Sequence, residues 1–257
     1  MPLTENQANL KQELIDTGEE WSTSFDNILS LDEDYFEAYV GLRRVPRNKK
    51  ALPVKIQELV LLAMDAACTH LYDHGIRVHT AAALKAGATK QEIMETLQLS
   101  SVLGVHAVTV GVPTLMEVLK ENGQEIKQDL DERQEKMKET FTKNRGYWST
   151  SWDPVIRLSP DFFEGYLNFS SVPFIEGHNA LDAKTKELMY TAIDCSTTHL
   201  FQPGLKIHIQ NAVKYGATPE EIMEVFELAA LMGISTTMKG ADALVEELKS
   251  HEGKADY

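Results

Sequence analysis

The feature that most constrains the fold of this chain is an internal repeat. Residues 55–104 reappear at 184–233 with a constant offset of 129 positions, and about two positions in five are identical. Residues 21–46 match 148–173 in the same way, at an offset of 127. A repeat of this length indicates a structural unit that the chain contains twice. The sequence therefore predicts two similar modules rather than one large domain.

The two modules are expected at residues 1–122 and 123–257. Each then has a length within the usual range for a domain. No Gly/Ser-rich linker separates them, and the junction at 123–147 is charged and rich in helix-forming residues. This composition predicts a continuous connector helix between the modules.

Helical signals dominate both modules. We expect helices over 32–43, 54–72 and 76–86, with a counterpart of the first at 159–169. Thr89 begins a further helix with a capping box, in which a threonine is followed three residues later by a glutamate. No segment alternates apolar and polar residues for long enough to predict a strand. The predicted fold class is all-α.

Charge and composition restrict the partners. The chain carries a formal net charge of −14, which repels the phosphate backbone of nucleic acids and anionic lipid surfaces. The polar N-terminus lacks the apolar run of a signal peptide, and we see no apolar stretch that approaches the length of a membrane span. The two cysteines stand at different places in the two modules and form no disulfide framework. We expect a cytoplasmic protein that binds a small molecule, with no nucleic acid and no membrane.

Comparing the two copies identifies polar positions that both have kept. They are two acids, a threonine and two histidines in each module: Glu58, Asp65, Thr69, His70 and His79, matched by Glu187, Asp194, Thr198, His199 and His208. On one helix, Glu58, Asp65 and Thr69 would share a face. A tight helical hairpin would return His79 to Glu58, where the carboxylate would fix the imidazole tautomer and raise its pKa. We expect Asp65 and Thr69 to buttress this hairpin through hydrogen bonds.

Two motifs occur in both modules. E-L-x-x-x-A-x-D begins at Glu58 and Glu187, and G-A-T-x-x-E-I-x-E ends at Glu95 and Glu224. On these motifs the chain resembles the carboxymuconolactone decarboxylase family, which includes the AhpD-like alkylhydroperoxidases. The resemblance implies an all-helical AhpD-like fold, two family modules fused in one chain, and assembly into a homo-oligomer.

The chain departs from the peroxidase branch of that family. The branch carries C-x-x-C-x-x-x-H, and counting back from the second histidine of each module places the cysteines at Tyr72 and Gly75, and at Phe201 and Gly204. Peroxide reduction through a disulfide needs an attacking and a resolving thiol. Neither thiol is in place, so the sequence argues against an alkylhydroperoxidase.

The resemblance then implies the decarboxylase branch: a carboxy-lyase that acts on a small carboxylated lactone or organic acid from the breakdown of aromatic compounds. Loss of CO₂ leaves electron density on carbon, and a histidine acid beside a cation or donor that binds carboxylate suits that step. The glutamate and second histidine of each module are the catalytic pair by resemblance. We add the first histidine, which we interpret as replacing the first cysteine. The candidate catalytic residues are thus Glu58, His70, His79, Glu187, His199 and His208.

Several alternatives remain open at this point. The chain could be a vestigial relative of the peroxidases, or a non-catalytic oligomeric binding module. It could also bind Zn²⁺, Fe²⁺ or Mn²⁺ through the same glutamate and two histidines of each module (Glu58, His70, His79; Glu187, His199, His208), which are enough ligands for a divalent metal. No other cofactor is expected. The first histidines could instead cap a helix C-terminus. His106 is aligned with Ser235, which is either a real difference between two sites or of no consequence.

Overall fold

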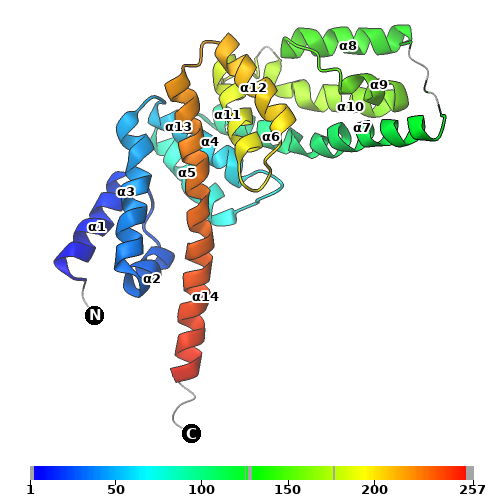
Figure 1. The fold of residues 1–257 in the computed structure, drawn as a ribbon. Helices are drawn as coiled ribbons and strands as arrows, with labels where there is room; N and C mark the ends of the chain where they lie inside the picture. The colour runs from blue at the N-terminus through cyan, green and yellow to red at the C-terminus, as the bar shows by residue number, and fades with distance from the viewer. Residues whose placement is uncertain (1–2, 125, 127–128, 176, 253–257) are drawn as a thin grey trace.

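The computed structural model describes residues 3–124, 126, 129–175 and 177–252 (Figure 1). These residues form α-helices and short 3₁₀ segments (η) and contain no strand, which confirms the all-α prediction. The first repeat contains α1 (Glu5–Asp16), α2 (Thr23–Leu31), α3 (Glu33–Lys49), α4 (Val54–Asp65), α5 (Asp73–Lys85), α6 (Lys90–Ser101), η1 (Val102–Val105) and α7 (His106–Glu121). The second contains α8 (Glu132–Arg145), α9 (Trp152–Leu158), α10 (Pro160–Ser171), η2 (Val172–Phe174), α11 (Ala183–Cys195), α12 (Gln202–Lys214), α13 (Pro219–Ala230), η3 (Leu231–Gly233) and α14 (Ile234–Glu252).

The equivalent helices α4 and α11 pack against each other at the centre of the molecule (Figure 1). Every residue of α4 from Gln57 to Asp65 is buried, as is every residue of α11 from Thr185 to Asp194. The main hydrophobic cluster contains side chains of both repeats, and a smaller one lies among α8, α9 and α10. The two repeats therefore share one core around a central helix pair.

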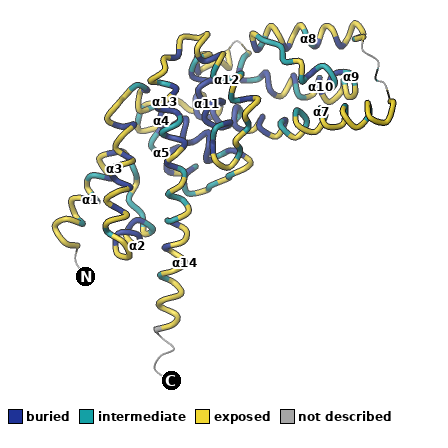
Figure 2. Tube along the Cα trace, viewed as in Figure 1, coloured by how far each residue is buried: buried dark blue, intermediate teal, exposed yellow. Residues whose placement is uncertain are grey.

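The last helix of each repeat packs against the other repeat. Helix α7 contacts α9, and α14 contacts α2. Asp242 on α14 accepts hydrogen bonds from Ser24 Oγ at 2.6 Å and Asn27 Nδ2 at 2.8 Å. The outer ends of α7 and α14 extend beyond the body and are mostly exposed (Figure 2). This exchange gives each repeat a wall made by its neighbour.

One stretch qualifies as a membrane span by length and composition, contrary to the expectation from sequence. It is Lys90–Glu121, which comprises α6, η1 and α7. Its first helix packs against α4 and α11, and its last against α9. A single helix of this kind is weak support for a membrane span, because core helices of globular folds have the same composition.

Two buried glutamates tie each repeat to the other. Glu224 on α13 accepts hydrogen bonds from the backbone N–H groups of Ala51 and Leu52, at 2.8 and 3.2 Å. It also accepts one from Gln57 Nε2 at 2.7 Å. All of these donors belong to the first repeat, so this carboxylate fixes the loop that leads into α4.

The equivalent Glu95 on α6 makes the reciprocal contacts. It accepts hydrogen bonds from the N–H groups of Ala180 and Leu181, both at 2.7 Å, ahead of α11. Glu95 and Glu224 are both fully buried. The last glutamate of the repeated G-A-T-x-x-E-I-x-E motif therefore holds the two repeats in register.

The central helices end earlier than the sequence predicted. Helix α4 ends at Asp65, whose carbonyl accepts a hydrogen bond from Tyr72 N–H at 2.9 Å. This bond closes a turn in which Leu71 has a left-handed φ of 46°. The second repeat turns in the same way at Leu200. The threonine and first histidine of each repeat therefore lie in a turn and not on the helix.

The predicted continuous connector helix is also wrong. Helix α7 ends at Glu121, and Gly123 follows with a left-handed φ of 67°. Helix α8 begins only at Glu132, where the side chain of Asp131 caps the first turn. A glycine stop and a capping box outweigh the helix propensity of the charged residues between them.

Replacing Glu224 with alanine tests the role of the reciprocal glutamates. Glu224→Ala removes the acceptor of the Ala51 and Leu52 N–H groups and one of the acceptors of Gln57 Nε2, so we expect the free energy of unfolding to fall by about 2–4 kcal/mol. The control is Glu227→Ala on the same helix, whose partner Lys49 is exposed. Its loss is expected to stay within about 1 kcal/mol. Urea unfolding followed by circular dichroism compares the two, and equal losses would contradict the assigned role.

Candidate active site

Each repeat contains the expected pair of glutamate and histidine. Glu58 on α4 and His79 on α5 are joined through Oε2 and Nδ1 at 2.8 Å. The second repeat has the same pair, Glu187 on α11 and His208 on α12, at 2.7 Å. The hairpins α4–α5 and α11–α12 bring these side chains together across 21 residues of chain. In both sites the carboxylate fixes the ring orientation and leaves Nε2 on the opposite side.

An aspartate faces that second ring nitrogen. Asp65 Oδ2 lies 3.6 Å from His79 Nε2, and its other oxygen lies 3.6 Å from His70 Nε2. The aspartate is thus a member of the site, between two histidines. This position differs from the buttressing role expected from sequence, and Thr69 lies exposed in the turn.

The second repeat preserves the order glutamate, histidine, aspartate, histidine. Asp194 lies 3.9 Å from His208 Nε2 through Oδ2 and 3.9 Å from His199 Nε2 through Oδ1. Its Oδ2 is buried without a hydrogen-bond partner among the described residues. The candidate catalytic residues of each repeat therefore converge, with the aspartate as the link between them.

A glycine makes room for each aspartate. A Cβ atom added to Gly75 would lie 2.1 Å from Asp65 Oδ2, and one added to Gly204 would lie 2.2 Å from Asp194 Oδ2. These glycines stand where the peroxidase pattern has its second cysteine. No side chain fits there while the aspartate keeps its place, so the structure gives a steric reason for the missing thiol.

The two cysteines that the chain does contain are poorly placed for thiol chemistry. Cys68 is exposed and Cys195 is half-buried, and both are free thiols. Burial raises the pKa of Cys195 to about 12, so this residue remains a thiol near neutral pH. Neither cysteine supports the peroxidase alternative.

Burial dominates the electrostatics of both sites. It raises the pKa of Asp65 to about 6 and that of Asp194 to about 7. It also lowers the pKa of His70, His79 and His199 below the usual histidine value. The expectation that a glutamate raises the histidine pKa is therefore wrong for His79, where loss of hydration outweighs the nearby carboxylates.

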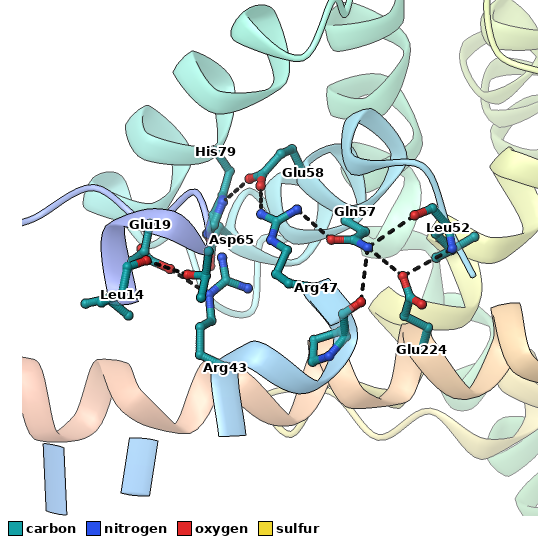
Figure 3. Close-up of polar contacts among 12 residues, drawn as sticks. Leu14, Glu19, Arg43, Arg47, Leu52, Gln57, Glu58, Asp65, His79 and Glu224 are labelled. Atoms are coloured by element: carbon teal, nitrogen blue, oxygen red, sulfur yellow. Dashed lines mark hydrogen bonds and ion pairs between the residues drawn. The ribbon is translucent and has the colours of Figure 1, made fainter. Parts of the chain in front are cut away.

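The first site is closed by its own charged side chains (Figure 3). Arg43 Nε pairs with Glu19 Oε2 at 2.9 Å, and Arg47 pairs with Glu58. These groups leave a cavity of about 50 Å³ beside His79. The histidine of the first repeat therefore faces little open space.

The second site is more open than the first. The charged pair of the first site has no counterpart here, since Gly146 stands in place of Glu19 and Ser170 in place of Arg43. The cavity of the second site measures about 480 Å³ and is lined by Asp194 and His208, by aromatic residues and by Arg145. This volume is within the range of small-molecule sites, whereas the cavity of the first repeat is far below it.

The exchanged helices complete the two cavities. Helix α14 contributes Ser235 to the first, and α7 contributes His106 to the second. His106 Nδ1 lies 2.7 Å from His199 Nε2, and the two rings are stacked. Burial, with the neighbouring His199 and His208, lowers the pKa of His106 to about 3, so its imidazole is neutral. The alignment of His106 with Ser235 is thus a real difference between the sites.

His106 also changes which residues could hold a metal ion. The ligand atoms of His106, Asp194 and His199 lie within 4.8 Å of one another, the one such cluster among the described residues. The sets expected from sequence, a glutamate and two histidines of one repeat, do not form such a cluster in the described structure. In both repeats the glutamate is instead held by its histidine on the far side of the ring.

The sequence comparison missed three residues that the structure places in the second cavity or in the contacts between the repeats. Arg145 has Gly18 as its counterpart, so the comparison of the copies passed over it. Glu95 and Glu224 were present in the motif, but nothing in the pattern indicated that they cross between repeats. A search for charged residues that differ between the copies would have found Arg145.

Substituting Gly204 tests the steric argument. Gly204→Ala forces the Asp194 carboxylate to move, and we expect a loss of about 1–3 kcal/mol in the free energy of unfolding. Gly240→Ala on α14 is the matched control, because its added methyl group meets nothing within 4 Å. This control should be neutral or slightly stabilising. A Gly204→Ala protein as stable as the control in urea would show that the site has room for a side chain.

The raised pKa of Asp194 predicts a pH-dependent effect on stability. The unfolded chain loses this proton near the ordinary aspartate pKa of 3.8, whereas the folded chain keeps it up to about pH 7. The Asp194 carboxyl therefore makes the natural protein less stable as the pH rises through this window, and Asp194→Asn lacks that contribution. We expect the variant's relative free energy of unfolding to rise by up to about 4 kcal/mol between pH 4 and pH 8.

Urea unfolding at several pH values measures this difference. Asp65→Asn is the matched comparison. Its free energy of unfolding relative to the natural protein should stop rising nearer pH 6, because the pKa of Asp65 is raised only to about 6. A gap between Asp194→Asn and the natural protein that stays constant with pH would contradict the raised pKa.

Comparisons with known proteins assign this architecture to a family. The model of the carboxymuconolactone decarboxylase family matches residues 33–121 and 160–247, one segment in each repeat. A solved structure from Burkholderia xenovorans, described as a candidate gamma-carboxymuconolactone decarboxylase subunit, is 42% identical to this chain. The match covers 97% of this chain and 100% of that one, with a TM-score of 0.92. No curated protein matches the chain. The chain thus belongs to the carboxymuconolactone decarboxylase family.

Proposed function

We propose that the protein is a carboxy-lyase that removes CO₂ from a small carboxylated lactone or organic acid, and that the reaction takes place at the site of the second repeat. Family membership supports the reaction class. The observation that carries the choice of site is the 480 Å³ cavity, onto which His208 and Asp194 both open. A monocyclic acid fits a cavity of this size.

The proposed reaction breaks the bond between the carboxylate and the ring carbon. The electron pair stays on the substrate and is delocalised into an adjacent unsaturated lactone, while CO₂ leaves. A proton must then reach the carbon that carries the charge. A positioned acid typically accelerates such a transfer by about 10²–10⁴-fold.

His208 and Asp194 supply that proton in our proposal. Asp194 holds a proton up to about pH 7 because of its burial, and its Oδ2 lies 3.9 Å from His208 Nε2. Glu187 holds the other nitrogen of His208 at 2.7 Å and fixes the plane of the ring. A proton that passes from His208 to the substrate can be replaced from Asp194.

The first repeat is not the preferred site, although it has the same four residues in order. Its cavity of about 50 Å³ is too small for a monocyclic acid. Glu58 is also paired with Arg47, whereas the residue aligned with that arginine in the second repeat is the uncharged Phe174. We infer that the first repeat supports the structure and that the second carries out the reaction.

Turnover of the paired histidine variants tests both parts of the proposal. With γ-carboxymuconolactone as substrate and CO₂ release as the measurement, His208→Gln should lower kcat by about 10²–10⁴-fold. His79→Gln, the matched substitution in the first repeat, should leave kcat within about twofold. Equal losses in the two variants would contradict the assignment to the second repeat.

The same assay separates the rival functions. If the natural protein binds the lactone and releases no CO₂, and neither histidine variant alters that binding, the chain is a binding module. If activity requires a divalent ion and is lost in His106→Ser, the cluster of His106, Asp194 and His199 is a metal site. A protein shown by elemental analysis to be metal-free and fully active excludes that alternative.

A further inference from the structure

Arg145 carries a buried positive charge that the protein does not neutralise. The residue ends α8, is 8% exposed and lines the larger cavity. Its guanidinium donates to Tyr190 Oη and to the Ser170 carbonyl, both at 3.1 Å, and lies over the ring of Phe174. Among the described residues it forms no ion pair with a carboxylate. Buried charges are costly without a partner, so this site is suited to an anionic ligand.

The surrounding tyrosines do not supply the missing negative charge. Burial raises the pKa of Tyr190 to about 12 and that of Tyr147 and Tyr166 above the usual tyrosine value. All three phenols are therefore neutral near pH 7. They can orient the guanidinium by hydrogen bonds, but they cannot compensate its charge.

The first repeat shows what a neutralised version of this arrangement looks like. Gly18 replaces Arg145, and a Cβ added to it would lie 3.4 Å from Nη2 of Arg47. A guanidinium thus occupies a similar place in both repeats but comes from α8 in one and α3 in the other. In the first repeat it pairs with Glu58 and with Gln57 (Figure 3). The guanidinium of the second repeat has no such partner.

Tyr190 connects the guanidinium to the proposed proton donor. Its hydroxyl accepts the hydrogen bond from Arg145, and its ring stacks on His208 with a centroid separation of 4.6 Å. The corresponding residue in the first repeat is Leu61, which offers neither contact. One side chain therefore sets the spacing between a bound anion and the acid.

The chemistry of decarboxylation decides which carboxylate Arg145 can usefully bind. The departing carboxylate loses its negative charge in the transition state, so a cation on it would stabilise the reactant more than the transition state. A cation used for binding is better placed on a carboxylate that stays on the product. Building on the proposed function, we propose that Arg145 binds the carboxylate that the substrate retains, while the departing carboxylate lies near His208.

The binding test uses two unreactive probes. One is γ-butyrolactone-γ-acetate, a saturated lactone whose one carboxylate stands on a side chain and not on the ring carbon that would lose CO₂, and the other is its neutral carboxamide. Binding is followed by calorimetry and by the fluorescence of Trp152, which lines the cavity. We expect the natural protein to prefer the carboxylate about 10- to 100-fold, the usual range for a charged hydrogen bond.

Arg145→Met should abolish the preference for the carboxylate over the carboxamide. Arg145→Lys, which keeps the positive charge, should reduce the preference without abolishing it. Arg47→Lys in the first repeat is the matched control. It should keep the full preference, because the cavity of the first repeat is too small to admit the probe. A preference that survives in both Arg145 variants overturns the proposal.

Kinetics distinguish a retained from a departing carboxylate. For a dicarboxylate lactone, Arg145→Lys should raise KM about 10-fold with kcat nearly unchanged, as expected when binding common to reactant and transition state is lost. A higher kcat would instead place Arg145 on the departing group and overturn the assignment. If the natural protein binds the probe through Arg145 but releases no CO₂ from any lactone, the proposed function fails and the anion site stands.

Discussion

The reciprocal contacts of Glu95 and Glu224 are the constraint on which the rest of the structure depends. Each carboxylate is buried in one repeat and accepts its hydrogen bonds from the loop ahead of the central helix of the other. These bonds fix the start of α4 and α11, and those two helices supply the glutamate and aspartate of both sites. The geometry of either site therefore requires both repeats, and so does its enclosure, because α7 and α14 cross to the opposite cavity.

The two sites share the same catalytic candidates but differ in the side chains that surround them. The line of glutamate, histidine, aspartate and histidine is the same in both, with closely similar distances. The difference is made by a few positions around it, where a charged pair in the first repeat corresponds to Gly146 and Ser170 in the second. The guanidinium of Arg145 in the second repeat forms no ion pair with a carboxylate among the described residues, whereas that of Arg47 in the first pairs with Glu58. The first site is filled by ion-paired side chains, and the second contains a cavity of about 480 Å³.

The sequence was sufficient for the helical class, the duplication and the family, because those depend on patterns that repeat along the chain. It also paired Glu58 with His79, since a hairpin follows from the turn signal between them. It failed for the end of α4 and for the connector, where single backbone contacts outweigh helix propensity. It could not place Asp65 between two histidines or bring His106 to His199, because those contacts depend on how helices distant in sequence cross. The catalytic roles themselves remain predictions.

The close approach of Gly204 to Asp194 has a consequence for how such proteins can change over evolutionary time. A Cβ atom at this glycine position overlaps the carboxylate in its present position, so a cysteine there requires the aspartate side chain to move or to be replaced. A change from an acid site of this kind to a thiol site therefore involves the aspartate as well as the glycine. In a duplicated protein, one repeat can undergo both changes while the other keeps its aspartate in place.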